Sequence, residues 1–268
     1  MKYMGPSKVT VLTASYNPGH YLKEAVESVR NQTYEHWRHV IVDDASTDSS
    51  LKIIQEHLND PRVTLVKNAT NLGQSKTQNK GLAVIDTPYT LMLDSDDLLV
   101  HDAIECLLTE SEKVADEVAL ICGKKEVFYY FDHKVLGKYV DHNELQYSDR
   151  YSFLLENYVP YPRFYRTDAL KAVGGWPTDD PYEGRYLEDR RMDLRLLEKY
   201  SFHWMDRLLY RYRKHESTLT SKFDVMNEMI EWNVRDALRR WGDHYDPIFS
   251  MKNGWKVLDK LVEKGEKE

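Results

Sequence analysis

Strand-like and helix-like hydrophobic patterns alternate through the first hundred residues. Four apolar runs predict buried strands, at 9–14, 37–42, 62–66 and 89–93. Between these runs, apolar side chains recur every three or four residues and predict amphipathic helices at 22–29, 51–58 and 74–84. Because strands that alternate with helices form βαβ units, we expect an α/β fold with a mainly parallel sheet and helices on both faces.

The pattern changes after residue 100. A helix is expected near 101–114, the tyrosine-rich tract EVFYYFDHKVLGKYV predicts a β-hairpin, and strand and helix signals continue to about 213. Two apolar stripes in the tail predict amphipathic helices, one with Met226, Met229, Ile230, Val234, Ala237 and Trp241 and the other with Trp255, Leu258, Leu261 and Val262. We therefore expect an α/β domain over 1–217, with halves at about 1–100 and 101–217, and a C-terminal helical extension over 218–268.

The composition is that of a soluble globular protein, with 30% charged and 41% hydrophobic residues. The formal net charge of −7 argues against a nucleic-acid partner, which would need a basic excess. No apolar run reaches the roughly 20 residues of a membrane span, and the opening MKYMGPSK lacks the apolar stretch of a signal peptide. We expect a cytoplasmic protein, with peripheral contact at the inner face of the membrane left open.

The two amphipathic helices predicted in the tail could have more than one role. We expect the tail helices to cover the α/β domain, ahead of forming a homo-oligomer or lying on a membrane, because their polar faces mix acidic and basic residues.

Cys106 and Cys122 lie in an expected helix and an expected strand, without the spacing of a zinc site. Both are interpreted as buried thiols.

Polar residues gather where the four amino-terminal strands end. They form four groups: Ser15-Tyr16-Asn17, Asp43-Asp44, Asn71-Leu72-Gly73, and Asp94 with Asp96 and Asp97. The carboxyl ends of parallel strands share one edge of a sheet, where α/β proteins bind ligands. Two carboxylates about 5 Å apart repel by roughly 3 kcal/mol at an effective dielectric of about 20. The aspartate cluster is therefore interpreted as a site for Mn²⁺ or Mg²⁺ with substrate phosphates, in preference to a solvated turn.

Three other phosphate or metal sites are excluded by the sequence. An EF-hand loop starting at Asp94 would place Leu98 and Leu99 where an oxygen ligand and the turn glycine belong. A dinucleotide site would need GxGxxG after the first strand, where the chain reads SYNPGHYL. A Walker loop is also absent from the sequence.

Four motifs together resemble a known family. In order, VTVLTASYNPGHYLKEAVESVRNQTYEHWRHVIVDDASTDSS, NLGQSKTQNKGL, LMLDSDDLL and YLEDRRMDLRL resemble the inverting family 2 glycosyltransferases with the GT-A fold. The similarity extends over roughly residues 8–217. It implies a nucleotide-sugar donor, most often a UDP-sugar, and a DxD-type metal site that uses Mn²⁺ or Mg²⁺.

The resemblance also implies which residues meet the donor and the metal. Asp44 would face the nucleobase, and the pocket would also include Ala14, Tyr16, Asp43 and Ser95. Asn79 and Lys76 are further donor candidates, although Asn79 could equally be a packed polar group of its helix. Asp94 and Asp96 match the DxD pair, with Asp96 as the direct ligand and Asp97 beside it. His215, with Arg213 and Ser217, would close the donor site near the metal.

On the acceptor side, the Glu-Asp motif is expected to supply the catalytic base. Asp189 would take the proton of the acceptor hydroxyl, and Glu188 would orient the acceptor. From the residues alone, both carboxylates could merely complement a helix N-terminus. Tyr161, Arg163 and Trp176 match the wall that faces the acceptor, although such aromatic residues could equally belong to the core.

The function expected from these motifs is metal-dependent inverting transfer of a sugar to a glycan, lipid-linked or protein hydroxyl, as in cell-surface polysaccharide biosynthesis. A sugar nucleotidyltransferase would need a glycine-rich basic loop after the first strand, where SYNPGHYLKE offers one lysine. A non-catalytic nucleotide- or glycan-binding module is the other alternative. It is disfavoured because every expected carboxylate is present.

Overall fold

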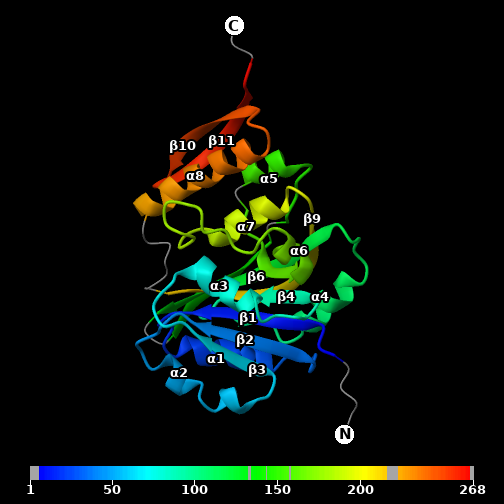
Figure 1. Cartoon of the computed structure of the whole chain (residues 1–268), viewed down its shortest axis with the longest axis vertical. Helices are drawn as coiled ribbons and strands as arrows, with labels where there is room; N and C mark the ends of the chain where they lie inside the picture. The colour runs from blue at the N-terminus through cyan, green and yellow to red at the C-terminus, as the bar shows by residue number, and fades with distance from the viewer. Residues whose placement is uncertain (1–5, 132–133, 143, 157, 216–222, 266–268) are drawn as a thin grey trace.

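The amino-terminal half of the molecule is a parallel α/β layer (Figure 1). The computed structural model describes residues 6–131, 134–142, 144–156, 158–215 and 223–265. Its first elements are β1 (Val9–Ser15), α1 (Tyr21–Arg30), β2 (Trp37–Asp43), α2 (Ser50–Ile53), a 3₁₀ turn (His57–Asn59), β3 (Val63–Lys67), α3 (Gln74–Leu82) and β4 (Tyr89–Met92). The strands lie in the order β3-β2-β1-β4 and are parallel. The four predicted strands are confirmed, whereas the helix expected over 51–58 is split into α2 and the 3₁₀ turn.

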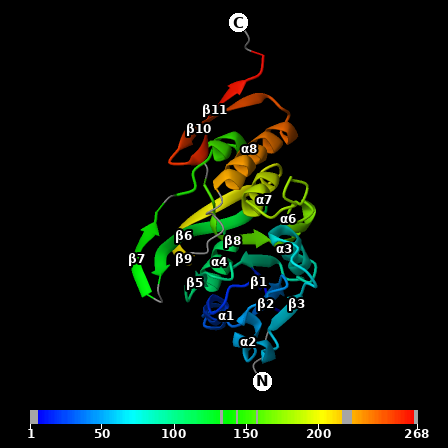
Figure 2. The ribbon, with the colours of Figure 1, turned by 90° about the vertical axis from the view of Figure 1, so that its left-hand side faces the viewer.

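The second half of the chain extends this sheet with antiparallel as well as parallel pairs. Its elements are β5 (Leu98–Leu99), α4 (Ala103–Ser111), β6 (Val118–Phe131), β7 (Lys134–Asp141), α5 (Arg150–Glu156), β8 (Tyr161–Arg166), α6 (Thr167–Ala172), α7 (Glu188–Leu196) and β9 (Ser201–Lys214). The sheet order continues β4-β8-β6-β9-β5, and β7 pairs with β6. β8 is antiparallel to both of its neighbours, whereas β6 and β9 are parallel. Figure 2 shows β7 standing out from the body of the sheet, as part of the hairpin that the tyrosine-rich tract predicts.

Side chains of β1 alternate between two hydrophobic cores, one on each face of the sheet. All residues of β1 are buried. Val11 packs in a cluster that includes Ala25 of α1 and Leu107 of α4. The next residue, Leu12, belongs to a second cluster with Leu82 of α3 and residues of α5, α6, α7 and α8. Helices therefore cover both faces, and the predicted α/β class is confirmed.

The described part of the C-terminal extension, residues 223–265, contains a helix followed by a hairpin, so the prediction of two helices is wrong for its second part. α8 (Phe223–Arg240) carries the first predicted stripe, but the second lies on β11 (Trp255–Glu263), which pairs antiparallel with β10 (Tyr245–Lys252). The connection is Asn253-Gly254, with φ of 52° and 83°. Asn-Gly with two positive φ values is the preferred two-residue hairpin turn. This turn signal outweighs the helical spacing of four apolar residues.

The extension shares a core with the preceding α/β layer. Val234 and Trp241 of α8 and Leu258 of β11 are buried in the cluster that contains α3, α5 and α7 residues. The boundary predicted at residue 217 lies outside the described residues. Among the helices that the structure describes, none combines the length and the apolar character needed to cross a bilayer.

The buried imidazole of His39 is expected to make the fold sensitive to mild acid. Burial lowers the pKa of His39 from 6.5 to about 3. Below about pH 6.5 the unfolded chain therefore binds a proton that the folded chain does not bind, so stability is lost as the pH falls toward 3. Between about pH 7 and pH 5, His39 should remove about 2 kcal/mol from the free energy of unfolding.

Urea unfolding at several pH values measures this effect. His39→Gln should flatten the dependence of stability on pH, whereas His101→Gln, at an exposed position, should leave the slope as in the wild type. Equal slopes for His39→Gln and the wild type would contradict the assignment.

Candidate active site

The expected carboxylates lie along one edge of the sheet, although each is held by a different set of partners. β2, β1 and β4 are adjacent and parallel, so Asp43-Asp44, Ser15-Tyr16 and Asp94 come together at their carboxyl ends. Tyr16 is 52% exposed at this edge. Ala14, two residues earlier, is buried inside β1. The predicted shared edge is therefore present.

Asp44 clamps the loop that follows β3. Its Oδ1 accepts hydrogen bonds from Asn68 Nδ2 at 2.7 Å and from the backbone N–H of Leu72 at 2.8 Å, and its Oδ2 accepts one from Gly73 N–H at 2.9 Å. Gly73 has φ of 85°, and a Cβ there would lie 2.7 Å from Cγ of Arg185. Both oxygens of Asp44 are therefore engaged in holding this loop at the edge of the sheet.

Asp43 supports the neighbouring turn. Its two carboxylate oxygens accept long hydrogen bonds from the backbone N–H of Ser46, at 3.4 and 3.3 Å. Asn17, which has φ of 50°, accepts hydrogen bonds at its Oδ1 from the N–H groups of Thr47 and Asp48. Asp43 thus holds the turn that follows its own strand, and Asn17 joins the segment after β1 to the segment after β2.

The three aspartates after β4 have three different environments. Asp94 is paired with Arg163, whose Nη2 donates to its two oxygens at 3.2 and 3.0 Å. Asp96 is partly exposed, and its Oδ2 lies 2.9 Å from Nε2 of His215. Asp97 is buried and accepts a hydrogen bond from the backbone N–H of Arg213 at 2.7 Å. Burial, together with the charges of Asp96 and Asp94, raises the pKa of Asp97 well above its ordinary value.

The structure brings together only part of the predicted metal set. Asp97 was expected as a ligand, but its burial and its bond to Arg213 make it a support for the loop. Within the described part of the chain, no group of three or more His, Cys, Asp or Glu side chains is arranged to hold a metal ion. Asp96 and His215 offer one oxygen and one nitrogen ligand side by side, and Ser95 lies in the same turn, partly exposed.

Arg213 was expected to contact the donor, and the structure instead buries it beneath the aspartate loop. Its Nη2 donates to Glu24 of α1 at 2.8 Å, and its Nε donates to the backbone oxygen of Asp96 at 2.7 Å. The guanidinium also lies 4.6 to 5.0 Å from the ring centroids of Tyr21, Phe128 and Tyr130. A side chain so enclosed holds the loop in place. Ser217 lies outside the described residues.

The Glu-Asp pair opens α7 and faces the aspartate cluster. Oδ2 of Asp189 accepts a hydrogen bond from Arg163 Nη1 at 2.7 Å, and its Oδ1 accepts one from the backbone N–H of Arg190 at 2.7 Å. Glu188 Oε1 lies 3.4 Å from Gln78 Nε2 of α3. Burial, followed by the charge of Asp189, raises the pKa of Glu188 to about 8. Glu188 is therefore mostly protonated at neutral pH.

Several predicted contact residues are engaged by the protein itself. Lys76 forms an ion pair with Glu183. Asn79 accepts a hydrogen bond from Trp176 N–H at 2.8 Å and donates one to its backbone oxygen at 2.7 Å, so the packed-helix alternative describes it better. Trp176 is 2% exposed, in edge contact with Tyr165, and belongs to the core instead of the acceptor wall. Tyr161 is partly buried below Lys125, whose Nζ lies 4.6 Å from its ring centroid.

A comparison with known families identifies the family of this chain. The family model described as Glycosyl transferase family 2 matches residues 10–174, which is more than half of the chain and includes β1 to β8. The chain belongs to glycosyltransferase family 2.

Relatives of this family 2 chain differ in length. Glycosyltransferase GlyA of Streptococcus pneumoniae is 27% identical over 194 residues, covering 70% of this chain and 26% of the relative. Chondroitin synthase of Escherichia coli is 28% identical over 272 residues, covering 95% of this chain and 36% of the relative. The chain thus spans about a third or less of the length of these two proteins.

Solved structures confirm the expected GT-A fold. The crystal structure of S. aureus TarS 1–349 superposes with a TM-score of 0.66 at 20% identity, covering 86% of this family 2 chain and 65% of TarS 1–349. TarS 1–349 in complex with UDP-GlcNAc superposes with a TM-score of 0.64 at 19% identity, covering 84% and 66% of the two chains.

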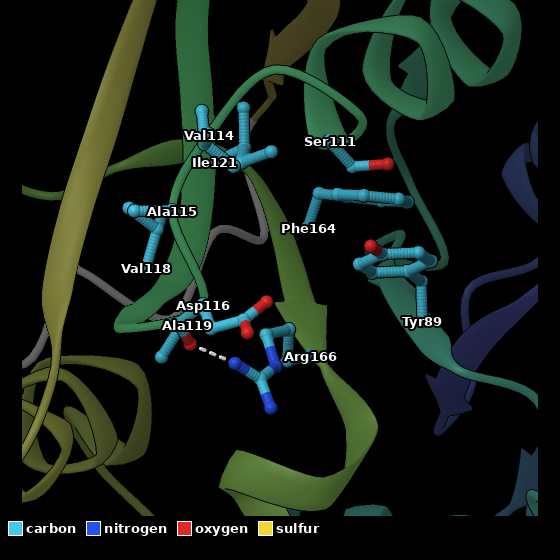
Figure 3. Close-up of a pocket in the computed structure, with 10 residues that line it drawn as sticks. All are labelled: Tyr89, Ser111, Val114, Ala115, Asp116, Val118, Ala119, Ile121, Phe164 and Arg166. Atoms are coloured by element: carbon cyan, nitrogen blue, oxygen red, sulfur yellow. Dashed lines mark hydrogen bonds between the residues drawn. The ribbon is translucent and has the colours of Figure 1, made fainter.

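The enclosed cavity drawn in Figure 3 is separate from the family 2 site. It has a volume of about 60 Å³ and is lined by the starts of β4 and β6 and the end of β8, including Tyr89, Val118 and Arg166. Arg166 donates a hydrogen bond to the backbone oxygen of Asp116 there. Tyr89 and Asp94 lie at opposite ends of the β4 segment, so this cavity is at the other edge of the sheet. The volume of this cavity is also far below roughly 300 Å³, the lower end of the range for small-molecule pockets.

Proposed function

We propose that this chain transfers a sugar, with inversion, from a nucleotide-diphosphate sugar, most favourably a UDP-sugar, to a hydroxyl of a glycan, lipid-linked or protein acceptor. The observation that carries the proposal is the pairing of Asp189 and Asp94 through Arg163. This pairing places Asp189, the candidate base, beside the edge of the sheet where the sugar end of the donor would lie.

The names and bound ligands of related proteins support this chemistry. TarS 1–349 was crystallised with UDP and with UDP-GlcNAc. An E. coli relative, 26% identical over 141 residues, is named UDP-Glc:alpha-D-GlcNAc-diphosphoundecaprenol beta-1,3-glucosyltransferase. A Pyrobaculum calidifontis mannosyltransferase with a TM-score of 0.57 and 16% identity was solved with GDP-Man and Mn²⁺. A UDP-sugar donor and an acceptor in surface polysaccharide synthesis follow for this chain as parts of the proposal.

Asp189 is the proposed general base. Its carboxylate is fixed by Arg163 and by the first turn of α7, and each oxygen keeps a lone pair for the acceptor hydroxyl. The acceptor oxygen bonds to the anomeric carbon as the bond from that carbon to the diphosphate oxygen breaks, and the hydroxyl proton passes to Asp189. Glu188, protonated at neutral pH, can donate a hydrogen bond to a sugar or acceptor oxygen.

Asp96 and His215 are the residues that would hold Mn²⁺ or Mg²⁺. One carboxylate and one imidazole leave most coordination positions to phosphate oxygens and water, as these ions commonly bind in phosphate-transferring sites. When bound, such an ion would neutralise the charge that develops on the leaving diphosphate. Asp94 and Asp97 would act by fixing the loop that presents Asp96.

A panel of nucleotide sugars tests the proposal before the acceptor is known. The chain is incubated with Mn²⁺ and each sugar nucleotide, and release of the nucleoside diphosphate is followed. We expect turnover with at least one sugar nucleotide, most favourably a UDP-sugar. If no member is hydrolysed and no nucleotide with Mn²⁺ raises the melting temperature, the proposed function is wrong.

Asp96→Ala should abolish the response to the metal while leaving the fold intact. In the wild type, Mn²⁺ with UDP at roughly 100 times Kd should add about 2.7 kcal/mol to the free energy of unfolding. The variant should lose most of this gain in a thermal-shift measurement. Asp86→Ala removes an exposed carboxylate that pairs with Arg38 before β4, and it should keep the full response. An undiminished response in Asp96→Ala would place the ion elsewhere.

A further inference from the structure

Arg163 contacts one carboxylate at the donor edge and one on the acceptor side. Asp94 follows β4 and Asp189 opens α7, and they are 95 positions apart in sequence, so the two carboxylates reach the site along different elements. Arg163 lies on β8, between them, and is 3% exposed. Its Nη1 serves Asp189 and its Nη2 serves both oxygens of Asp94. One guanidinium therefore fixes the separation of the two groups.

The surroundings of Arg163 leave its guanidinium little freedom. β8 pairs antiparallel with β4, and Arg163 is the register partner of Met92, two residues before Asp94. The guanidinium carbon lies 4.9 Å from the ring centroid of Tyr161, which supports it from one side. The planar, rigid guanidinium group, held in this way, can orient two carboxylates at once. The ammonium group of a lysine acts as a point charge and cannot.

The two negative charges of Asp94 and Asp189 also require a positive group such as the guanidinium of Arg163 beside them. The side chains of Asp94 and Asp189 are 25% and 18% exposed, and each forms an ion pair with the almost fully buried guanidinium of Arg163. Removing the guanidinium would leave two carboxylates facing each other without a counter-charge. Their repulsion would drive them apart, and Asp189 would move with the start of α7.

We propose that Arg163 is a positioning residue for the transfer reaction. It holds the carboxylate of Asp189 at a set place relative to the aspartate loop, so that the base meets the acceptor hydroxyl where the donor presents its anomeric carbon. This inference rests on the proposed function, because Asp189 and Asp94 have their roles only there. It also revises the expectation that Arg163 itself faces the acceptor, since the side chain is buried behind the two carboxylates.

Two substitutions separate this role from a purely structural one. Arg163→Lys keeps the positive charge but loses the fork, and Arg163→Met keeps much of the volume but loses the charge. Because misplacement by about 1 Å costs roughly 100-fold in rate, we expect kcat for hydrolysis of the preferred nucleotide sugar to fall about 100-fold in Arg163→Lys and further in Arg163→Met. KM for the same nucleotide sugar should stay within about threefold, because the donor contacts remain.

Arg166→Lys is the matched control. Arg166 is on the same strand, three residues further on, and pairs with Asp168 at the opposite edge. Its substitution should leave kcat and KM within about twofold of the wild type. Melting temperatures are recorded for every variant, and the kinetic comparison is made on those that melt cooperatively.

Chemical rescue supplies a readout that lost packing would not give. In Arg163→Ala, added guanidinium chloride, far below the concentration that unfolds the wild type, should restore part of kcat, whereas equal sodium chloride should not. Wild-type kcat in Arg163→Lys, or equal losses in kcat and donor affinity without rescue of Arg163→Ala, would overturn the inference. A wild-type chain that consumes no nucleotide sugar would instead refute the proposed function.

Discussion

Asp189→Asn is expected to lower sugar transfer about 1,000-fold or more while leaving UDP binding within about twofold of the wild type. The substitution keeps the side-chain volume and an oxygen that accepts the hydrogen bond from Arg163. An amide cannot take a proton at neutral pH, so the acceptor hydroxyl would lose its base. Single-turnover transfer or hydrolysis gives the rate, and titration calorimetry with UDP and Mn²⁺ gives the affinity.

Asp179→Asn is the control for this change. Asp179 is an exposed carboxylate that precedes α7 and pairs with Arg191 and Arg195, so its loss should alter the rate by about twofold at most. If Asp189→Asn binds UDP poorly, the residue belongs to the donor site; if it transfers sugar at the wild-type rate, another group is the base.

Asp44→Ala is expected to destabilise the fold by about 3 to 5 kcal/mol. The change would remove the acceptor of three donors. The backbone N–H groups of Gly73, which is buried, and Leu72, which is partly buried, would lose it, and so would Asn68 Nδ2, which keeps its hydrogen bond to Thr77 Oγ1. Each buried donor left unpaired costs about 1 to 3 kcal/mol, and water entering the loop would offset part of the sum. Urea unfolding should show a lower midpoint with an unchanged m value.

Two further variants decide what Asp44 does. Asp206→Ala, at an exposed position that pairs with Lys124, should change stability by about 0.5 kcal/mol or less. Asn68→Ala loosens the same loop but leaves the Asp44 carboxylate in place. If Asp44→Ala costs less than about 1 kcal/mol and still abolishes UDP binding, Asp44 contacts the nucleobase directly and is no clamp.

Much of the fold could be predicted because its amino-terminal half obeys simple patterns. The runs that become β1, β2 and β4 are almost wholly buried, and α1 buries Leu22, Ala25, Val26 and Val29 at helical spacing. The C-terminal hairpin was missed because apolar residues on a half-buried strand can imitate helical spacing over a short window. Asn253-Gly254 was the signal that identifies the hairpin.

The candidate site could be predicted as a set of carboxylates but not as a set of contacts. The rule that ligands bind at the carboxyl ends of parallel strands places Asp44 and Asp94 on one edge from sequence alone. Which carboxylate remains available to a ligand depends on hydrogen-bond and ion-pair partners that are distant in sequence. Arg213 reaches Asp97 from β9 and Arg163 reaches Asp94 from β8, and no local spacing encodes either meeting.

Aromatic residues show the same limit. Trp176 and Tyr161 both matched an acceptor wall by motif. The exposure of Trp176 depends on how the loop after α6 folds back on α3, and that of Tyr161 depends on Lys125 and on Tyr210 and Tyr212 of β9. Asn79 closes that loop over Trp176 with two hydrogen bonds. From the sequence, each ring could belong either to an acceptor-binding wall or to the hydrophobic core. Only the tertiary packing decides between these two roles.

The antiparallel register of β4 and β8 restricts how the gene can change in length. Met92 faces Arg163 across the two strands, and side chains alternate between faces at each step. Deleting or inserting one codon in either strand would turn the guanidinium to the other side of the sheet, away from Asp94 and Asp189. Length variation around the site should therefore be confined to the connecting loops, and libraries that aim to change its specificity should leave these two strands at their present length.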